Sequence, residues 1–317
     1  MKIYLPKYTS HAGRWIYDGY LDAWKQLGYE QGAPTPPTDG EEVAAYLLLP
    51  SEKETLNEEY IIMTTDALVQ QGGTHAMETA TRSHKTFVFT QPNIYPKPWG
   101  DHPNYQCIAS DETIDTLNQM DNVYLWNFGE TKKEHFFKWK EVHTIPLAFD
   151  PINYQPCKND DYKKYDICFV GGWVNNGFNE KRKIMIEIFS EFMKTNLKCG
   201  FFVGKNLTHQ QECDLLYNSR LTLNIHDAYQ RILGNDTNER TFKSLGLNGV
   251  LVSDTVRQLN HLFPNLSTSL DAKGLVEITQ NYLSLTEQEL TDIREKNRQD
   301  ILENHCYTNR IQQLLEL

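Results

Sequence analysis

The segment Gly234–Asp254, GNDTNERTFKSLGLNGVLVSD, carries the most information about the fold of this chain. It opens with turn-forming polar residues, continues with amphipathic spacing and closes in a short apolar run. Asp236 and Glu239 have the spacing of an Asp-led capping box, which predicts a helix from that point to about Leu247, where an Asn-Gly pair ends it. The pattern indicates a helix that is joined by a tight turn to a buried strand.

The residues around this helix favour an anion site. Leu221–Ile225 is predicted to be a strand, and His226 and Asp227 follow its carboxyl end. Free backbone N–H groups and the positive end of the dipole attract anions to a helix start, and Arg240 and Lys243, three positions apart, share a helix face. We expect phosphate there, and we expect an exposed Arg240 that is removable without loss of stability. The residues alone also permit a solvated face with ordinary polar caps.

Strand and helix patterns alternate along the whole chain. Gly13–Leu27, which Gly28 ends, and Asn179–Thr195 carry apolar stripes at helical spacing, and Thr286 with Glu289 forms a capping box. Such alternation predicts an α/β fold with parallel sheets that helices cover on both faces. The expected strands are Lys2–Leu5, Tyr60–Met63, Thr86–Phe89, Gln106–Ala109, Val123–Trp126, His143–Leu147, Asp166–Val170, Cys199–Val203, Leu221–Ile225 and Val250–Val252.

The length of 317 residues fits two Rossmann-like, doubly wound domains, at about 150 residues each. Three prolines and a charged stretch fall in Pro146–Asp166, between two predicted strands, so we assign residues 1–150 and 151–317 to the two domains. Ligands of open α/β sheets bind beyond the carboxyl ends of the strands. Two such domains facing each other would create a binding cleft.

Composition excludes several classes of protein. The formal net charge of −11, from 31 basic and 42 acidic residues, disfavours broad nucleic-acid binding. The N-terminal region has no apolar run near the ~20 residues of a bilayer span and no signal-peptide pattern, so we expect a cytoplasmic protein. The six cysteines form no Cys-x-x-Cys pair, which indicates reduced thiols. No dinucleotide-binding glycine motif, Walker A motif, nucleophile elbow or zincin motif occurs.

Five segments, in this order, resemble a known family. His143–Pro156, HTIPLAFDPINYQP, looks like the interdomain signature of GT-B glycosyltransferases. The other four resemble the C-terminal domain of the CgeB-like (spore-maturation type) glycosyltransferases. They are DICFVGGW (166–173), LLYNSRLTLNIH (215–226), NERTFKSLGLNGVLVSD (238–254) and NHCYTNR (304–310).

The resemblance implies a two-domain GT-B fold, with a nucleotide-sugar donor in the C-terminal domain and the acceptor in the N-terminal domain. The family pattern Asn-x-Arg-x-Phe-Glu is matched at Asn238, Arg240 and Phe242, but Lys243 stands where the acidic residue belongs. Because an acid near this place often receives the ribose hydroxyls in GT-B enzymes, this departure has consequences.

Three consequences of the departure stay open. Glu239 or Asp254 takes over the ribose contact, the donor is bound differently, or activity is lost. In an alternative interpretation, Lys243 instead adds a phosphate contact, which would suit a donor rich in negative charge.

The chemistry requires positive charge where the nucleoside diphosphate departs. No Asp-x-Asp occurs in the chain, so we expect no metal and no cofactor besides the donor substrate. Helix starts and basic side chains would supply the charge. The candidate donor-site residues are Gly171, Gly172, Lys205, His226, Asn238, Glu239, Arg240, Lys243 and Asp254.

The first domain would supply a base and an acceptor surface. His11, after the first strand, and Asp66, after the third segment of strand pattern, are the candidate catalytic bases. A solvated histidine and a helix cap at Thr65-Asp66 are the competing interpretations. The aromatic candidates for stacking on the acceptor are Trp15, Tyr95 and Trp99, which loop packing would equally explain.

The sequence therefore favours a metal-independent hexosyl- or pentosyltransferase that moves a sugar from a nucleotide sugar to a hydroxyl of a glycan or other acceptor. A nucleic acid is expected to take part only if a modified base in it is the acceptor of the sugar. A sugar-nucleotide epimerase and a non-catalytic nucleotide- or carbohydrate-binding protein on the same scaffold are the alternatives.

Overall fold

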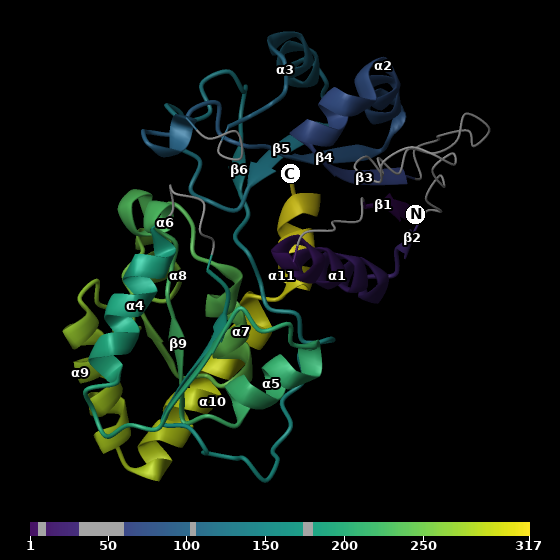
Figure 1. Cartoon of the computed structure of the whole chain (residues 1–317). Helices are drawn as coiled ribbons and strands as arrows, with labels where there is room; N and C mark the ends of the chain where they lie inside the picture. Colours follow the sequence, from purple (N-terminus) through teal and green to yellow (C-terminus); the bar gives the residue numbers. More distant parts are fainter. Residues whose placement is uncertain (6–10, 32–59, 102–105, 174–179) are drawn as a thin grey trace. The chain divides into compact units, whose positions relative to one another are not determined.

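The computed structural model describes residues 1–5, 11–31, 60–101, 106–173 and 180–317, without the side chains of residues 11–14. The chain divides into two units, one of Met1–Pro146 with Arg310–Leu317 and one of Leu147–Asn309 (Figure 1). No helix in the described ranges has the length and apolarity that a membrane crossing requires. All six cysteines are free thiols, as predicted.

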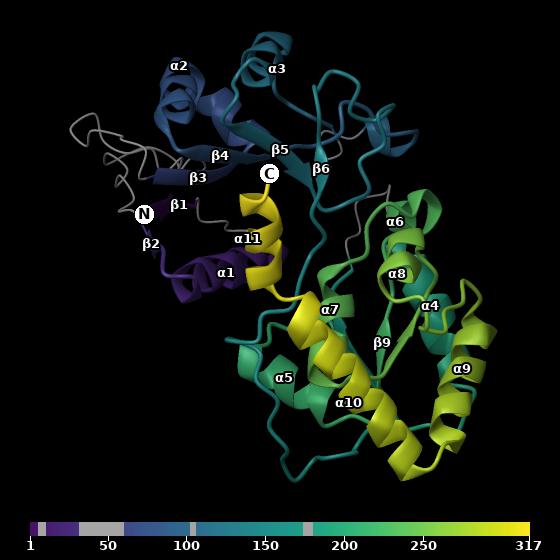
Figure 2. The ribbon, with the colours of Figure 1, turned by 180° about the vertical axis from the view of Figure 1, so that it is seen from behind.

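The first unit is a six-stranded parallel sheet in the order β2-β1-β3-β4-β5-β6. Helices α2 and α3 cover one face of the sheet, and α1 and α11 lie side by side at the other (Figures 1 and 2). The strands are Lys2–Tyr4, Glu30–Gln31, Tyr60–Thr65, Lys85–Phe89, Val123–Asn127 and His143–Thr144, for β1 to β6. The helices are α1 (His11–Gln26), α2 (Asp66–Arg82), η1 (Trp99–Asp101), α3 (Asp111–Asn118) and α11 (Tyr307–Leu315).

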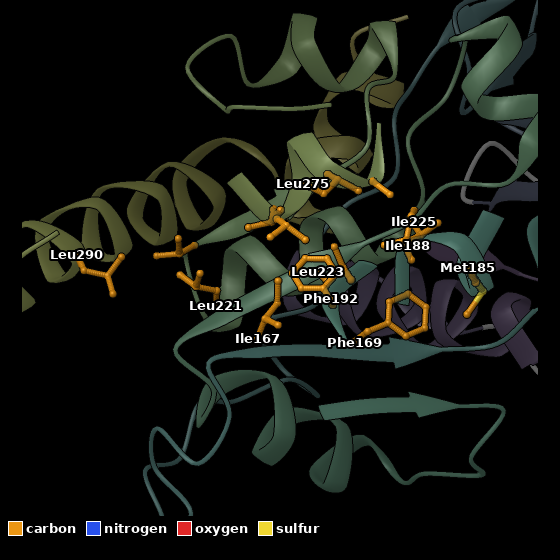
Figure 3. Close-up of a cluster of buried hydrophobic side chains, with 14 residues drawn as sticks. Ile167, Phe169, Met185, Ile188, Phe192, Leu221, Leu223, Ile225, Leu275 and Leu290 are labelled. Atoms are coloured by element: carbon orange, nitrogen blue, oxygen red, sulfur yellow. The ribbon is translucent and has the colours of Figure 1, made fainter. Parts of the chain in front are cut away.

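The second unit is a four-stranded parallel sheet in the order β10-β9-β7-β8. Its strands are β7 (Ile167–Gly171), β8 (Cys199–Val203), β9 (Leu221–Asn224) and β10 (Leu251–Ser253). Its helices are α4 (Lys181–Phe192), α5 (His209–Tyr217), α6 (Ala228–Leu233), α7 (Glu239–Leu247), α8 (Arg257–Leu262), α9 (Ala272–Ser284) and α10 (Glu287–Asn304). The core of this unit lies between the sheet and α4, and it contains Phe169, Leu223 and Phe192 (Figure 3).

Both sheets reverse the direction of strand addition once. In the first unit β1 lies between β2 and β3, and in the second unit β7 lies between β8 and β9. Ligands of open parallel sheets bind at such a switch point, outside the carboxyl ends of the strands. Each unit therefore has one topologically favoured binding edge, beside β1 and β3 or beside β7 and β9.

The structure confirms the α/β class and nine of the ten expected strands, with ends shifted by at most three residues. Gln106–Ala109 is the exception, because it forms no strand. Cys107 N donates to the carbonyl of Pro92 at 2.9 Å, and Cys107 and Ala109 pack on the core of the first unit from a loop. The apolar residues in this segment are spaced for burial against the core, and they do not pair with a strand.

Three predicted helix termini are confirmed and one predicted helix start is wrong. The helix that was expected to run to about Leu247, before Asn248-Gly249, ends there. Gly28, with φ 87°, follows α1, and Thr286 with Glu289 forms the capping box of α10. The predicted capping box of α7 does not form, because the helix begins after Asn238 and Asp236 instead accepts a hydrogen bond from Gln230 Nε2 at 2.6 Å.

The chain leaves the first unit after Pro146, four residues before the expected boundary, and returns to it at Arg310. Arg310 is only 2% exposed, and its Nε donates to the carbonyl of Pro146 at 3.0 Å. Lys85 Nζ donates to the carbonyl of Leu315 at 2.8 Å. Residues 310–317, which the sequence assigns to the second domain, therefore complete the first unit.

Candidate functional site

Arg240, in the first turn of α7, organises the carboxyl edge of the second sheet. Its Nε donates to the carbonyl of Val170 at 2.6 Å, and its Nη1 donates to Asn224 Oδ1 at 3.0 Å and to the carbonyl of Ile225 at 3.3 Å. One guanidinium thus joins the ends of β7 and β9 at the switch point. Burial lowers the pKa of Arg240, but a guanidinium keeps its charge at neutral pH.

The glycine that ends β7 makes room for this guanidinium. A Cβ atom at Gly171 would lie 2.2 Å from Arg240 Nη2, whereas a Cβ at Gly172 would meet nothing within 4 Å. The guanidinium also lies over the ring of Phe169, with Cζ 4.7 Å from the ring centroid. Nη2 itself makes no hydrogen bond to any residue that the structure describes. Its two N–H groups are available to an anion.

Lys181, the first residue of α4, is a second cation near this edge. It is 6% exposed, and its Nζ lies 2.7 Å from Oδ1 of Asp227, the N-cap of α6. Burial lowers the pKa of Lys181, the charge of Asp227 opposes that shift, and the charge of Arg240 adds to it. The sequence analysis did not single out this lysine. A lysine at the start of a helix that follows a strand and two glycines is the signal that would have found it.

His226 and Asp254 form a fully buried pair behind the edge. Both are 0% exposed, and His226 Nδ1 lies 2.6 Å from Asp254 Oδ1, with the His226 backbone N–H donating to the same carboxylate. His226 Nε2 lies 2.8 Å from Thr237 Oγ1, and Arg231 Nε lies 3.5 Å from Asp254 Oδ2. The pair fixes the segment between β9 and α7. Neither side chain presents surface to a ligand in this structure.

Lys243 is buried on α7 between two carboxylates. Its Nζ donates to Glu212 Oε1 at 2.9 Å and lies 3.4 Å from Glu239 Oε1. Tyr154 Oη donates to the other oxygen of Glu212 at 3.3 Å. Burial raises the pKa of Glu239 and the charge of Lys243 opposes the shift. The position that carries the acid in the family pattern is therefore the centre of an internal ion network.

The remaining donor-site candidates differ in exposure. Lys205 follows β8 on the surface, after Gly204 at φ 62°, and Gly172 is also exposed. Asn238 begins α7, and its Nδ2 donates to the carbonyl of Ile225 at 3.4 Å. The buried Asn238 Oδ1 has no hydrogen-bond partner among the described residues. Asn238 and Arg240 thus both offer unused polar atoms at the start of α7.

In the first unit, a pocket of about 340 Å³ lies at the corresponding edge of the sheet. Residues at or just beyond the carboxyl ends of β1, β3, β4 and β5 line it, together with the second and third turns of α1 and the first residues of α2. The lining residues are Leu5, Ile16, Tyr17, Tyr20, Met63, Thr64, Thr65, Asp66, Ala67, Phe89, Gln91, Trp126 and Phe128. The only sequence-predicted site residue among them is Asp66.

The side chain of Asp66, which lines the pocket, connects the start of α2 to the residues that follow β4. It is 2% exposed, Oδ1 accepts from its neighbour Ala67 N at 2.7 Å, and Oδ2 accepts from Gln91 N at 3.0 Å and from Thr90 Oγ1 at 3.2 Å. Burial raises the pKa of Asp66, and these hydrogen bonds oppose the shift. Thr65 caps α2 by accepting from Leu68 N at 3.2 Å. The capping interpretation is therefore correct for Thr65, and a catalytic role of Asp66 stays a prediction.

The other first-domain candidates do not line this pocket. Trp15 and Trp99 are buried, Tyr95 is half-buried, and none of the three belongs to the lining. His11 begins α1, and its side chain lies outside the described residues. Trp126, which the sequence placed in a strand, and Phe128 beyond it were not predicted as site residues. Aromatic residues at the carboxyl end of a predicted strand were the available signal.

Comparison with known proteins bears on both units. Residues 178–316 match the family model described as Glycosyl transferase-like. No curated protein matches the chain in sequence. In the part of the chain that the structure describes, no group of three or more His, Cys, Asp or Glu side chains is arranged to hold a metal ion.

Solved glycosyltransferase structures share the fold at low sequence identity. BGT of T4 phage, solved with its UDP-glucose substrate, has a TM-score of 0.55 at 12% identity over 100% of both chains. AviGT4, a glycosyltransferase of avilamycin A biosynthesis, has a TM-score of 0.56 at 11% identity, over 100% of this chain and 96% of the other.

A TarM mutant from S. aureus, in complex with fondaparinux, alpha-GlcNAc-glycerol and UDP, has a TM-score of 0.53 at 11% identity. The match covers 82% of this chain and 55% of TarM. The chain therefore has the GT-B glycosyltransferase fold, and its residues 178–316 carry the glycosyltransferase-like family pattern.

Proposed function

We propose that the protein is a glycosyltransferase and that its nucleotide-sugar donor binds at the carboxyl edge of β7 and β9. The observation that carries the proposal is Arg240, whose guanidinium is fixed by three hydrogen bonds while Nη2 has no partner among the described residues. Lys181 adds a second cation, and the start of α7 adds backbone N–H groups. Both lie in the segment that matches the glycosyltransferase-like family.

These residues suit the departure of a nucleoside diphosphate. In the transfer step the acceptor oxygen forms a bond to the anomeric carbon, and the bond between that carbon and the diphosphate oxygen breaks. The diphosphate leaves with the electron pair, and the acceptor proton goes to a base. Fixed positive charge stabilises the developing negative charge without reorganising during the reaction. We assign this task to Arg240 and Lys181, without a metal ion.

Glu239 is the better candidate for the ribose contact. Asp254 is 0% exposed and already accepts from His226, whereas the side chain of Glu239 is 15% exposed and, of the charged groups in the described ranges, has only Lys243 as an ion-pair partner within 4 Å. A carboxylate that keeps an accessible oxygen can accept a hydroxyl hydrogen bond. Glu239→Gln should therefore weaken the binding of a nucleoside diphosphate more than that of pyrophosphate.

The test is calorimetric titration of the whole protein with a panel of nucleoside diphosphates and nucleotide sugars. Arg240→Ala removes a charge-assisted hydrogen bond of about 1.5–3 kcal/mol, so affinity should fall at least ~10-fold. The matched control is Arg82→Ala, which changes the net charge equally at an exposed position of α2 in the first unit. If Arg240→Ala binds as tightly as the parent, the donor site lies elsewhere.

Arg240→Ala should also cost stability, contrary to the expectation from sequence. Its side chain holds the carbonyls of Val170 and Ile225, so its loss leaves them without this donor. We expect the free energy of unfolding to fall by about 1–3 kcal/mol. The titration therefore belongs at a temperature where denaturation curves show both proteins folded.

A non-catalytic nucleotide-binding protein is the second candidate. The observation that favours it is the ion network of Lys243, Glu212 and Glu239, which occupies the place of the family's acid. Donor binding without hydrolysis or transfer, over a panel of hydroxyl acceptors, would support it. Formation of any glycoside would exclude it.

A further inference from the structure

The pocket in the first unit is shaped for a ring-sized apolar molecule. Its volume is about 340 Å³, roughly twice the ~150 Å³ of an engineered cavity that holds benzene. Most of its surface is apolar. Two fused rings, or one ring with a short substituent, therefore fit its size.

Aromatic side chains form one wall. The ring centroid of Trp126 lies 5.1 Å from that of Phe89, 5.3 Å from that of Phe128 and 5.8 Å from that of Tyr20, all in edge-on arrangements. Edge-on packing of rings is a stable arrangement that holds each one in place. The wall is thus preorganised for contact with another flat or apolar body.

Two buried polar atoms in the lining have no partner among the described residues. They are Thr64 Oγ1 and Trp126 Nε1, in side chains that are 4% and 2% exposed. Leaving a buried donor or acceptor unpaired is costly, so such atoms call for an explanation. Each atom has less than 1 Å² of accessible surface, so a small shift of the pocket wall would be needed before a ligand oxygen could accept from Trp126 Nε1 or a ligand hydroxyl could bond Thr64.

Three other polar side chains of the lining, those of Tyr17, Thr65 and Asp66, already have partners within the unit. Tyr17 Oη accepts from Gln31 Nε2 at 3.2 Å, and Thr65 and Asp66 hold backbone N–H groups. A sugar ring carries several hydroxyls, each of which needs a partner when it is buried. The pocket therefore matches a molecule with one or two polar atoms better than a glycan.

We propose that this pocket binds a compact aromatic alcohol, whose hydroxyl meets Trp126 Nε1 and Thr64 Oγ1 and whose ring contacts the wall of Tyr20, Phe89 and Phe128. The identification of this molecule as the acceptor of sugar transfer rests on the proposed function. The binding itself does not, because all the described residues that line the pocket belong to the first unit.

The experiment is titration of the whole protein with 2-naphthol, without any nucleotide, in parallel with methyl β-glucopyranoside. We expect saturable 1:1 binding of 2-naphthol that is at least 10-fold tighter than that of the glycoside. Ala67→Leu, which fills the pocket, should weaken 2-naphthol binding at least 10-fold. Gln71→Leu adds the same side chain on the exposed face of α2 and should leave binding unchanged.

A second pair of variants tests the hydrogen bond. Trp126→Phe removes Nε1 but keeps a ring and should weaken 2-naphthol binding about 3- to 10-fold. Trp139→Phe is the control, since Trp139 is also buried, at 6% exposed, and its Nε1 has no partner among the described residues, but it does not line the pocket. Equal losses in both variants, unchanged binding by Ala67→Leu, or tighter binding of the glycoside would each overturn the proposal.

The outcomes separate the two proposals. If 2-naphthol binds as expected while no nucleoside diphosphate binds, the pocket assignment stands and the glycosyltransferase proposal fails. If nucleoside diphosphates bind and 2-naphthol does not, the glycosyltransferase proposal stands and the pocket assignment fails.

Discussion

The carboxyl edges of the two sheets occupy the same topological position and are filled in opposite ways. Beside β1 and β3 the edge leaves a pocket of about 340 Å³ with aromatic walls. Beside β7 and β9 the guanidinium of Arg240 holds the strand ends together. The fold sets where a ligand can bind, and the side chains at the strand ends set its chemistry.

The residue that follows or ends the central strand accounts for much of this difference. Leu5 follows β1 and lines the pocket as an apolar side chain. Gly171 ends β7 and has no side chain, so a long cation from α7 reaches the backbone there. We infer that the first edge selects apolar bodies and the second selects anions.

Among the substitutions that test this contrast, Lys243→Glu has the largest expected effect. It would restore the acid of the family pattern but place a third carboxylate beside Glu212 and Glu239 in a buried network. Breaking a buried ion pair typically costs about 3–5 kcal/mol, so we expect a loss of that size in urea denaturation. The double variant Glu212→Gln, Lys243→Gln should lose clearly less. A stable Lys243→Glu protein would show that the network contributes little to the second edge.

Gly171→Ala should break the second edge alone. Its Cβ would lie 2.2 Å from Arg240 Nη2, so the guanidinium has to move and its hydrogen bonds to the strand ends weaken. We expect a loss of about 1–3 kcal/mol in stability and at least ~10-fold in nucleoside-diphosphate affinity, with 2-naphthol binding unchanged. Gly172→Ala, which meets nothing within 4 Å, should resemble the parent in all three measurements.

A third effect concerns pH. Burial raises the pKa of Asp236, beside α6, from 3.8 to about 6. The folded protein then holds this proton more tightly than the unfolded chain does, so stability falls as pH rises from about 4 through 6. Asp236→Asn removes that dependence and should gain about 3 kcal/mol over the parent above pH 7, and little at pH 4. Parallel stability curves of the two proteins would contradict the shift.

Local patterns predicted the framework of the fold and the placement of Arg240. Alternating apolar runs marked the strands, and the position of Arg240 three residues from Lys243 put both on one helix. Their partners were not predictable, because Val170 and Glu212 lie 70 and 31 residues away in sequence. The spacing of Asp236 and Glu239 predicted that Asp236 caps a helix. Its side chain instead accepts a hydrogen bond from Gln230.

The pocket of the first unit was also not predictable from local sequence patterns. Tyr20, Phe89 and Trp126 come from one helix and two strands, and only the sheet order brings their rings together. No local pattern distinguishes an aromatic side chain that fills a core from one that lines a pocket. The sequence therefore directed attention to Trp15, Tyr95 and Trp99, which the structure places outside it.

The return of residues 310–317 to the first unit sets an order of events during synthesis. Residues 147–309 leave the ribosome before Arg310 does, so the second unit has its whole sequence available while the first still lacks α11. Until then the first unit is without Arg310, which is 2% exposed in the folded protein and bonds the carbonyl of Pro146. The first unit is thus the last of the two that can finish folding, and nascent-chain proteolysis should find it sensitive until residues 310–317 have emerged.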